Sequence, residues 1–264
     1  MKIVSLNIWD LPLWFVRDRK ERISRIKDFF HETDPDIVCL QESFDPDHRM
    51  RLNGFLGSAA YATSDTDVRS RNVLGTKLDT TGGLVTYSKF RVLESVFIPF
   101  RRLFFSPLEM LGRKGMLITL LDTPYGRLRV VNLHLYKKSL LWDEAIRVSQ
   151  LKRVFAHMRS LGSLPTIMAG DFNQRDLAHN RKFLQLIAEN NFVNPQGDMR
   201  EPSYRAENKY VDIWINRIRR SKRLDYMLHN DLGALHLRSH ECRVLCRKEP
   251  MSDHDPVMLR LRPE

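Results

Sequence analysis

The sequence has few cysteines, and it has no apolar run long enough to cross a membrane. Its three cysteines, Cys39, Cys242 and Cys246, are too few for a disulfide framework and lack the paired spacing of a zinc site. No stretch approaches the roughly 20 consecutive apolar residues of a membrane-spanning helix. The first residues, MKIVSLNIWD, lack the longer apolar stretch and the small-residue cleavage site of a secretory signal. These absences lead us to expect a cytoplasmic protein with reduced thiols.

Low-complexity tracts, internal repeats and long linkers are missing as well. The composition is 42% hydrophobic and 28% charged, with 12 glycines and 12 prolines, which excludes a disordered or collagen-like chain. At roughly 150 residues per domain, 264 residues correspond to between one and two domains. Because no linker interrupts the chain, we predict a single domain over residues 1–264.

Positive charge is in clear excess. The 43 Lys and Arg residues outnumber the 32 Asp and Glu residues, so the net charge is +11. Such a balance favours polyanionic partners: nucleic acid, phosphorylated metabolites or an anionic membrane surface, to which the protein would bind peripherally. The charge does not choose among these partners, and a merely well-solvated surface would look the same. Nothing in the sequence calls for an obligate protein partner.

Apolar periodicity predicts strands and helices in alternation. The predicted strands are 1–9, 36–43, 83–90, 115–121, 127–136, 165–171, 223–228 and 257–261, and the predicted helices are 17–33, 141–161 and 177–190. The turn TPYG at 123–126 predicts a hairpin, which requires antiparallel neighbours, whereas helical connections favour parallel ones. We therefore predict the α/β class, with a mixed sheet or two packed sheets flanked by helices.

Polar side chains occur at the ends of these strands. They are Asn7, Glu42, His134, Asp171, Asn173, Asp225, Asp253 and His254. Singly, such residues are most often turn formers or hydrogen-bonded core histidines. Strand ends on one sheet edge can converge, and together these groups offer oxygen ligands for Mg²⁺ or Mn²⁺ and histidines for proton transfer. In a basic chain without a nucleotide-binding glycine loop, this combination points to metal-assisted hydrolysis of a phosphate ester.

The same residues lie in blocks that resemble a known family. SLNIWD, CLQES, GGLVTYSK, NLHL, GDFN, RLDYML and SDHDPV resemble, in order, the blocks of the endonuclease/exonuclease/phosphatase superfamily, the DNase I-like fold. The blocks extend from Asn7 to Pro256 and so cover nearly the whole chain. The resemblance implies a four-layer α/β sandwich, in which two packed mixed sheets are flanked by helices.

The resemblance also implies a metal site and a group of water-positioning residues. Asn7 and Glu42 would hold a divalent cation, Mg²⁺ or alternatively Mn²⁺, with Asp253 near it or bound through water. Asp171 and Asn173 would position and polarise the attacking water and the scissile phosphate.

Two histidines complete the implied active site. His254 would act as general base or phosphate ligand, oriented by Asp225 as a carboxylate holds one imidazole tautomer. His134 would bind a phosphoryl oxygen or protonate the leaving group.

The N-terminal block narrows the resemblance. Residues 5–30, with a Trp-Asp-x-Pro-like segment before an Arg-rich helix, resemble the opening of neutral sphingomyelinases, and GGLVTYSKF followed by RKGML resembles paired blocks of that branch. Lys114 in the second block is a predicted substrate-binding residue. The chain departs from the membrane-bound members in lacking a transmembrane helix and from the secreted ones in lacking a signal peptide. A phospholipid headgroup is the resulting substrate hypothesis.

Two alternatives stay open at this point. The +11 charge and the basic run RIRRSKR at 217–223 suit a DNA or RNA phosphodiesterase, because phosphate contacts dominate nucleic-acid affinity. A non-catalytic module that uses the fold as a basic binding platform is the second alternative.

Residues 96–111, VFIPFRRLFFSPLEML, have two interpretations. They form either a core strand followed by a loop, or an interfacial surface whose rings enter the lipid headgroup boundary beside Arg101 and Arg102. Pro99 and Pro107 argue against a regular central strand throughout. On the second interpretation, Arg101 and Arg102 bind substrate.

Overall fold

The computed structural model describes residues 1–54, 61–63, 70–73, 76–79, 82–100, 113–137, 143–175, 177–197, 201–211 and 221–264. In the described part of the chain, no helix is long and apolar enough to cross a membrane.

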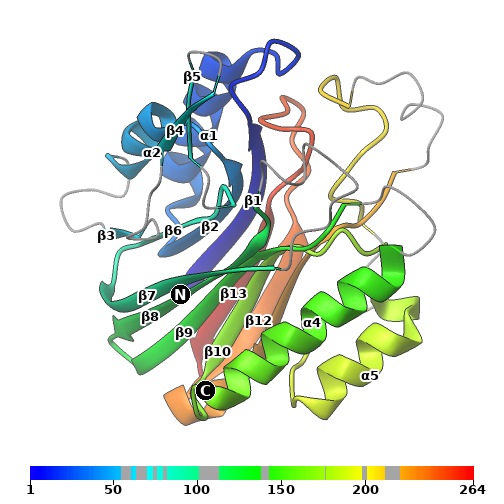
Figure 1. Cartoon of the computed structure of the whole chain (residues 1–264). Coiled ribbons are helices and arrows are strands. Elements are labelled where there is room, and N and C mark those ends of the chain that lie inside the picture. Colours follow the sequence, from blue (N-terminus) through cyan, green and yellow to red (C-terminus); the bar gives the residue numbers. More distant parts are fainter. Residues whose placement is uncertain are drawn as a thin grey trace.

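Two mixed β-sheets lie face to face at the centre of the molecule (Figure 1). The first sheet has the order β12-β13-β1-β2-β6-β3, formed by Leu237–Val244, Val257–Pro263, Lys2–Asp10, Ile37–Ser43, Val85–Ser88 and Tyr61–Thr63. The second sheet has the order β11-β10-β9-β8-β7, formed by Asp225–Asn230, Thr166–Asp171, Gly126–His134, Gly115–Thr123 and Arg91–Pro99. Each sheet contains one parallel pair, β1 with β2 and β9 with β10. A separate small ribbon pairs β4 (Ser70–Val73) with β5 (Thr76–Asp79).

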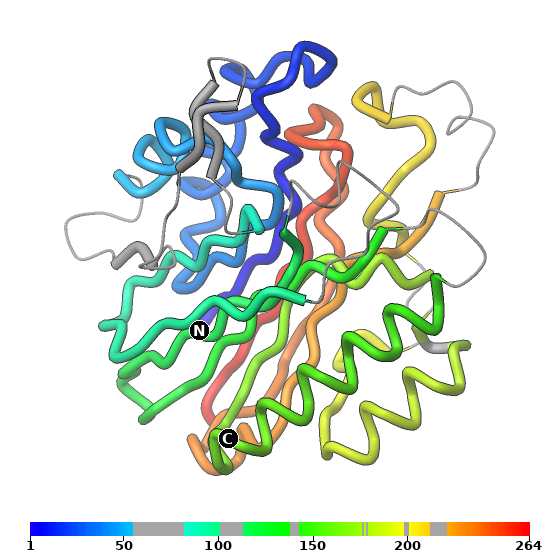
Figure 2. The backbone as a smooth tube through the Cα atoms, viewed as in Figure 1, coloured from blue at the N-terminus to red at the C-terminus, as the bar shows by residue number. Residues whose placement is uncertain are grey.

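Helices cover the outer face of each sheet (Figures 1 and 2). Helices α1 (Arg19–Thr33) and α2 (Pro46–Asn53) pack on the first sheet, and α4 (Asp143–Ser160) and α5 (Arg181–Glu189) pack on the second. Short 3₁₀ turns lie at η1 (Leu177–His179) and η2 (Leu232–Leu235). The architecture is therefore the four-layer α/β sandwich that the sequence motifs imply.

Strict alternation along the strands builds three apolar layers. On β1, Ile3 belongs to the core between the sheets, whereas its neighbour Val4 packs against the first-sheet helices. On β10, Ile167 lies between the sheets and Met168 packs under α4 and α5. Because successive side chains on a strand point to opposite faces, every second residue of the central strands enters the space between the sheets.

Most predicted elements are present, with shifted ends. Helix α1 begins at Arg19 rather than at residue 17, because Asp18 has a left-handed φ of 53°. The predicted helix 177–190 is divided into η1 and α5, and the Asn180 side chain caps α5 by accepting from the Phe183 amide. The hairpin at 123–126 joins β8 to β9 as predicted.

Among the described elements, the sequence analysis missed the short β3, β4, β5 and η2, and also β7, β12 and α2. Strands β7 and β12 lie at sheet edges, and their burial varies irregularly along the chain, so the period-two signal is weak. Helix α2 is short, but its start is marked by Asp45, whose side chain accepts from two backbone amides, followed by Pro46.

Part of the interfacial interpretation of residues 96–111 is wrong. Residues up to Pro99 belong to β7, and Phe100 is buried in the core under α4. The Phe100 ring therefore packs in the core and is not available to enter a lipid surface. Arg101 and Arg102 lie outside the described residues.

Candidate active site

Three strands of the second sheet place three polar side chains in one row. In the β-ladder, Asp171 at the end of β10 lies directly opposite His134 of β9 and Asp225 of β11. All three are buried, and aligned residues on neighbouring strands point to the same face. The His134 Nε2 atom lies 3.3 Å from Asp171 Oδ2. The register of the sheet thus brings together residues that are far apart in the sequence.

The first sheet faces this row with an amide and a carboxylate. Asn7 Nδ2 donates to Glu42 Oε1 at 3.1 Å and to Asp171 Oδ2 at 3.2 Å, so Asn7 links the two sheets. Gln41 points between the sheets. Because successive side chains of a strand point to opposite faces, Glu42 would face the helices if the strand were regular. Its left-handed φ of 53° departs from the strand geometry, which brings its carboxylate into the site.

Below the site, amide side chains connect the two sheets. Gln41 Nε2 donates to Asn132 Oδ1 at 2.7 Å and to Ser5 Oγ at 3.2 Å. Asn132 Nδ2 donates to the backbone carbonyls of Leu40 and Val85, both at 2.9 Å. These buried hydrogen bonds fix the separation and register of the two sheets. They therefore also fix the positions of Asn7, Glu42 and His134, which follow one or two residues later on the same strands. Sequence reasoning missed this layer, although Ser5, Gln41 and Asn132 lie inside the SLNIWD, CLQES and NLHL blocks.

His254 is held by a carboxylate and a serine. Its Nδ1 lies 2.7 Å from Asp225 Oδ2, which also accepts from Ser203 Oγ at 2.6 Å. Ser203 Oγ in turn accepts from the backbone amides of Leu224 and Asp225. This leaves His254 Nε2 facing Asp171 Oδ2 at 4.0 Å. Ser203 was not predicted, and no motif marks it.

The charges of the site shift several pKa values. Burial alone would lower the pKa of His254, but the carboxylates of Asp225 and Asp253 raise it to about 10. For Asp171, burial acts to raise the pKa, and the hydrogen bond and charge of His134 lower it well below the usual range. His254 therefore favours its protonated form, and Asp171 its ionised form.

Oxygen atoms suited to a hard cation gather beside this group. Glu42 and Asp253 are buried carboxylates, and burial together with the nearby charge of Glu42 raises the pKa of Asp253. Asn7 Oδ1 accepts from the Trp9 amide at 3.1 Å, which fixes the orientation of the amide. Two buried carboxylates and an oriented amide fit Mg²⁺ or Mn²⁺, because carboxylate and carbonyl oxygens are the ligands these ions prefer.

Two further predicted residues lie at the edge of the site. Asn173 has a left-handed φ of 50°, and it donates from its backbone amide to Asp171 Oδ1 at 2.8 Å and from its side chain to the Leu135 carbonyl at 3.0 Å. Lys114 Nζ donates to the same carbonyl at 3.1 Å, and its charge acts to lower the pKa of Glu42 and Asp171. Both residues are thus connected to the site through the strand that carries His134.

Lys137 is a cation that sequence reasoning missed. The residue is exposed. Desolvation of its ammonium group acts to lower its pKa, but the carboxylates of Glu42 and Asp253 raise it overall. Lys137 therefore supplies positive charge to the acidic side of the site.

Comparisons with known proteins assign the chain to a family. The sequence model of the endonuclease/exonuclease/phosphatase family matches residues 4–254. The chain belongs to this family. Members of the family hydrolyse phosphate esters, so the chain is a phosphoester hydrolase. Its Asp171, Asp225 and His254 lie close enough together to share an ion, but a protonated His254 has no free lone pair on either ring nitrogen for a metal.

Solved structures of the family share the fold over almost the full chain. Sphingomyelinase C from Streptomyces griseocarneus is 18% identical, with 98% of each chain covered and a TM-score of 0.73. A beta toxin structure from Staphylococcus aureus is 17% identical, with 98% of this chain and 99% of that chain covered and a TM-score of 0.75. A humanized TDP2 of D. rerio is 16% identical, with 99% of each chain covered and a TM-score of 0.70. No curated protein sequence is significantly similar to the chain.

A second acidic group on the first-sheet side is already neutralised. Asp10, Asp45 and His48 lie close enough together to share an ion. However, Arg19 donates to Asp10 at 2.8 Å and to Asp45 at 2.6 Å, and His48 Nδ1 lies 3.0 Å from Asp10. The group thus joins α1 and α2 to the end of β1, which is a structural role.

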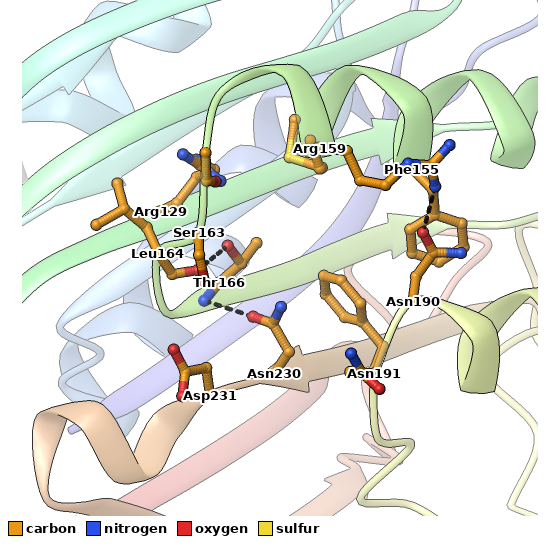
Figure 3. A pocket seen from close by; sticks show the side chains of 13 residues that line it. Arg129, Phe155, Arg159, Ser163, Leu164, Thr166, Asn190, Asn191, Asn230 and Asp231 are labelled. Carbon is orange, nitrogen blue, oxygen red and sulfur yellow. Dashed lines mark hydrogen bonds between the residues drawn. The ribbon is translucent and has the colours of Figure 1, made fainter.

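A cavity of about 550 Å³ lies at the opposite end of the sandwich (Figure 3). Its wall includes Arg129 and Thr166, which pair with each other near the starts of β9 and β10. His134 and Asp171 end the same two strands, about 16 Å away at a rise of ~3.3 Å per residue. The Arg129 guanidinium donates to the Leu161 and Gly162 carbonyls at 3.1 Å. The cavity is therefore separate from the candidate active site, and its buried arginine already has partners.

Proposed function

We propose that this hydrolase cleaves a phosphodiester in a phospholipid headgroup and uses Mg²⁺ or Mn²⁺. The observation that carries the proposal is the meeting of Asn7 and Glu42 with Asp171 and the Asp225-oriented His254 between the sheets. These groups supply oxygen ligands on one side and proton-transfer groups on the other. The finer choice of a lipid is supported by the likeness to sphingomyelinase C over 98% of both chains.

Asn7, Glu42 and Asp253 would hold the cation. When bound there, it would polarise the phosphoryl oxygens and offset the charge that develops on them. A related structure, a beta toxin variant of Staphylococcus aureus, contains bound magnesium ions. Burial and the nearby charge of Glu42 raise the pKa of Asp253, and a cation bound between these two carboxylates would offset their mutual repulsion.

Asp171 and His254 would divide the proton and phosphate chemistry. Asp171 stays ionised because its pKa is lowered, so it can accept a hydrogen bond from the attacking water and orient it. The carboxylates of Asp225 and Asp253 raise the pKa of His254, which suits the role of phosphate ligand and charge stabiliser; the general base is the alternative role. A protonated His254 is suited to a phosphoryl oxygen as its hydrogen-bond acceptor.

His134 is suited to the leaving group. Its Nε2 lies 3.3 Å from Asp171 Oδ2, at the centre of the candidate site. A buried imidazole at this position could donate a proton to a departing oxygen. Asn173 and Lys114 would position the substrate from the neighbouring loop and strand.

A nucleic-acid phosphodiester is the second candidate substrate. The net charge of +11 favours a polyanion. In the basic run, Lys222 is half-buried just before β11 and Arg223 is buried, and residues 217–220 lie outside the described residues. The similarity in fold to TDP2 over 99% of both chains also supports this candidate.

A substrate panel tests the proposal. The protein is incubated with sphingomyelin in mixed micelles, phosphatidylcholine in mixed micelles, supercoiled plasmid and bis-p-nitrophenyl phosphate, each with Mg²⁺ or with EDTA. We expect Mg²⁺-dependent release of a phosphorylated headgroup, and we expect none with Asp171→Asn. Plasmid nicking without headgroup release would favour the nucleic-acid candidate. Absence of hydrolysis from every substrate would contradict the proposed function.

A further inference from the structure

The loop between β1 and α1 presents an apolar tip to solvent. Trp14 is 94% exposed and Phe15 is 42% exposed, and their rings form an edge-to-face pair with centroids 5.7 Å apart. Leu11, Pro12 and Leu13 precede them and are half-buried. Neighbouring exposed aromatic residues on an apolar loop are typical of an interaction surface, since each scarcely benefits from burial in the protein itself.

The base of this tip is rigid. Val16 is buried, and the Arg22 guanidinium donates to the Arg17 carbonyl at 3.0 Å, the Ile8 carbonyl at 2.7 Å and the Trp9 carbonyl at 3.0 Å. Arg22 is itself fully buried. The exposure of Trp14 therefore belongs to an anchored loop.

The tip lies at the same end of the molecule as the active site. Figure 2 shows residues 11–18 (dark blue) beside the loops before β11 (yellow) and before β13 (red). Arg17 of this loop donates to the Lys209 carbonyl at 2.7 Å. In the helix that follows the loop, Arg25 donates to the Pro250 carbonyl at 3.3 Å. The third segment leads directly to Asp253 and His254.

Exposed cations lie in the segments next to the rings. Arg17 and Lys20 follow Phe15 in sequence, with Asp18 as an exposed acid between them, and Arg17 contacts the segment that carries the exposed Lys209. Aromatic rings flanked by cations suit a bilayer interface, where the rings enter the headgroup boundary and the cations approach lipid phosphates. A tryptophan is especially suited to this region, because it has a large apolar body and a single polar N–H group.

We infer that Trp14 and Phe15 insert into the surface of a phospholipid bilayer and dock the active-site end of the enzyme on it. The binding partner of this loop is the bilayer surface, which presents zwitterionic and anionic headgroups. The inference deepens the proposed function and rests on it for the choice of a lipid. Docking is a binding event, so it is measured without hydrolysis.

Vesicle binding tests the inference directly. Flotation with phosphatidylcholine–phosphatidylserine vesicles in EDTA compares the wild type with the double variant Trp14→Ser, Phe15→Ser. We expect the variant to partition at least ~10-fold more weakly, with the same urea unfolding midpoint. The matched control is Leu184→Ser with Val193→Ser, which removes two exposed apolar side chains of 39% and 53% exposure near the other end of the molecule. We expect the control to bind as the wild type does.

A fluorescence measurement locates the inserted ring. The chain has four tryptophans, and lipids with brominated acyl chains quench only those that enter the bilayer. We expect quenching in the wild type and its loss in Trp14→Phe, although Trp14→Phe still binds vesicles.

Three results would overturn the inference. They are unchanged vesicle binding by the double variant, equal loss in the control, and a loss of binding to single-stranded oligonucleotides with vesicle binding intact. The last would identify the rings as a base-stacking surface.

Hydrolysis of bis-p-nitrophenyl phosphate, a soluble diester, distinguishes a failure of the docking inference from a failure of the proposed function. If the wild type fails on it and on every lipid but still docks through Trp14, the proposed function falls and the docking surface stands.

Discussion

The Asp225 carboxylate holds His254 Nδ1 at 2.7 Å while it accepts a second hydrogen bond, at 2.6 Å, from Ser203. An ionised carboxylate only accepts hydrogen bonds, so His254 Nδ1 must carry hydrogen and Nε2 is the atom presented to Asp171. The orientation of the imidazole in the site thus depends on a residue that need not touch the substrate.

Asp225→Asn should therefore slow catalysis through His254. The asparagine amide has no negative charge to stabilise a protonated imidazole, and its NH₂ group can turn toward Nδ1 and favour a neutral ring that carries its proton on Nε2. We expect kcat to fall at least ~100-fold, in the range of general acid–base groups, with KM less affected. The measurement is steady-state kinetics on a soluble phosphodiester. In a His254→Ala background, the same change should cost far less. An equal loss in both backgrounds would mean that the two residues act independently.

Glu42→Gln should remove most of the response to metal. The substitution keeps the size of the side chain but removes a charge from the cation site. For the wild type, Mg²⁺ at about 100 times its Kd should stabilise the fold by about 2.7 kcal/mol, which thermal unfolding detects as a rise in Tm. We expect little rise for Glu42→Gln and an undiminished one for the control Glu189→Gln on the exposed side of α5. A full Mg²⁺ response in Glu42→Gln would exclude Glu42 as a ligand.

Asp45 should contribute to acid unfolding. Burial acts to raise its pKa, but the hydrogen bond from Arg19 and the charge of His48 lower it overall. A depressed folded-state pKa means stability that is present above the unfolded value, about 3.9, and is lost as pH falls through the folded-state pKa. Asp45→Asn keeps a side chain that can cap α2 but loses the ion pair.

Urea unfolding at two pH values measures this contribution. At neutral pH, Asp45→Asn should lower the unfolding free energy by about 0.5–1 kcal/mol, and the difference from the wild type should vanish at pH values below the folded-state pKa. Asp47→Asn, an exposed neighbour in α2, serves as the control. A difference that persists in strong acid would assign the loss to capping or packing.

Gly170→Ala should destabilise the strand that ends at Asp171. Gly170 has a φ of 150°, and a Cβ there would lie 1.9 Å from the Leu133 carbonyl oxygen. We expect a loss of at least ~2 kcal/mol by chemical denaturation. Gly197→Ala is the matched control, because its φ is 52° and nothing lies within 4 Å of the added Cβ, so only the conformational cost of about 1–2 kcal/mol applies. Equal losses at both positions would show that the strand moves to accommodate the methyl group.

The site residues and the strands that carry them were predictable from the sequence. Alternation of apolar residues marks β1, β2, β9 and β10, and the polar residue at the end of each strand interrupts that pattern. Their identities, an amide, carboxylates and a histidine, already indicate metal-assisted phosphoester chemistry. Local pattern suffices here because each strand must bury one apolar face against helices and the other against the opposite sheet.

Only the tertiary structure decides which residues complete and present the site. Ser203 reaches Asp225 from an irregular segment, and Glu42 enters the site through a left-handed backbone conformation. The segment WFV at 14–16 looks uniformly apolar in sequence, yet Trp14 is exposed and Val16 is buried. Periodicity reports a residue's neighbours only within a regular element. In loops, and between the two sheets, contacts depend on register and on hydrogen bonds such as that of Arg17 with Lys209, which join residues far apart in the sequence.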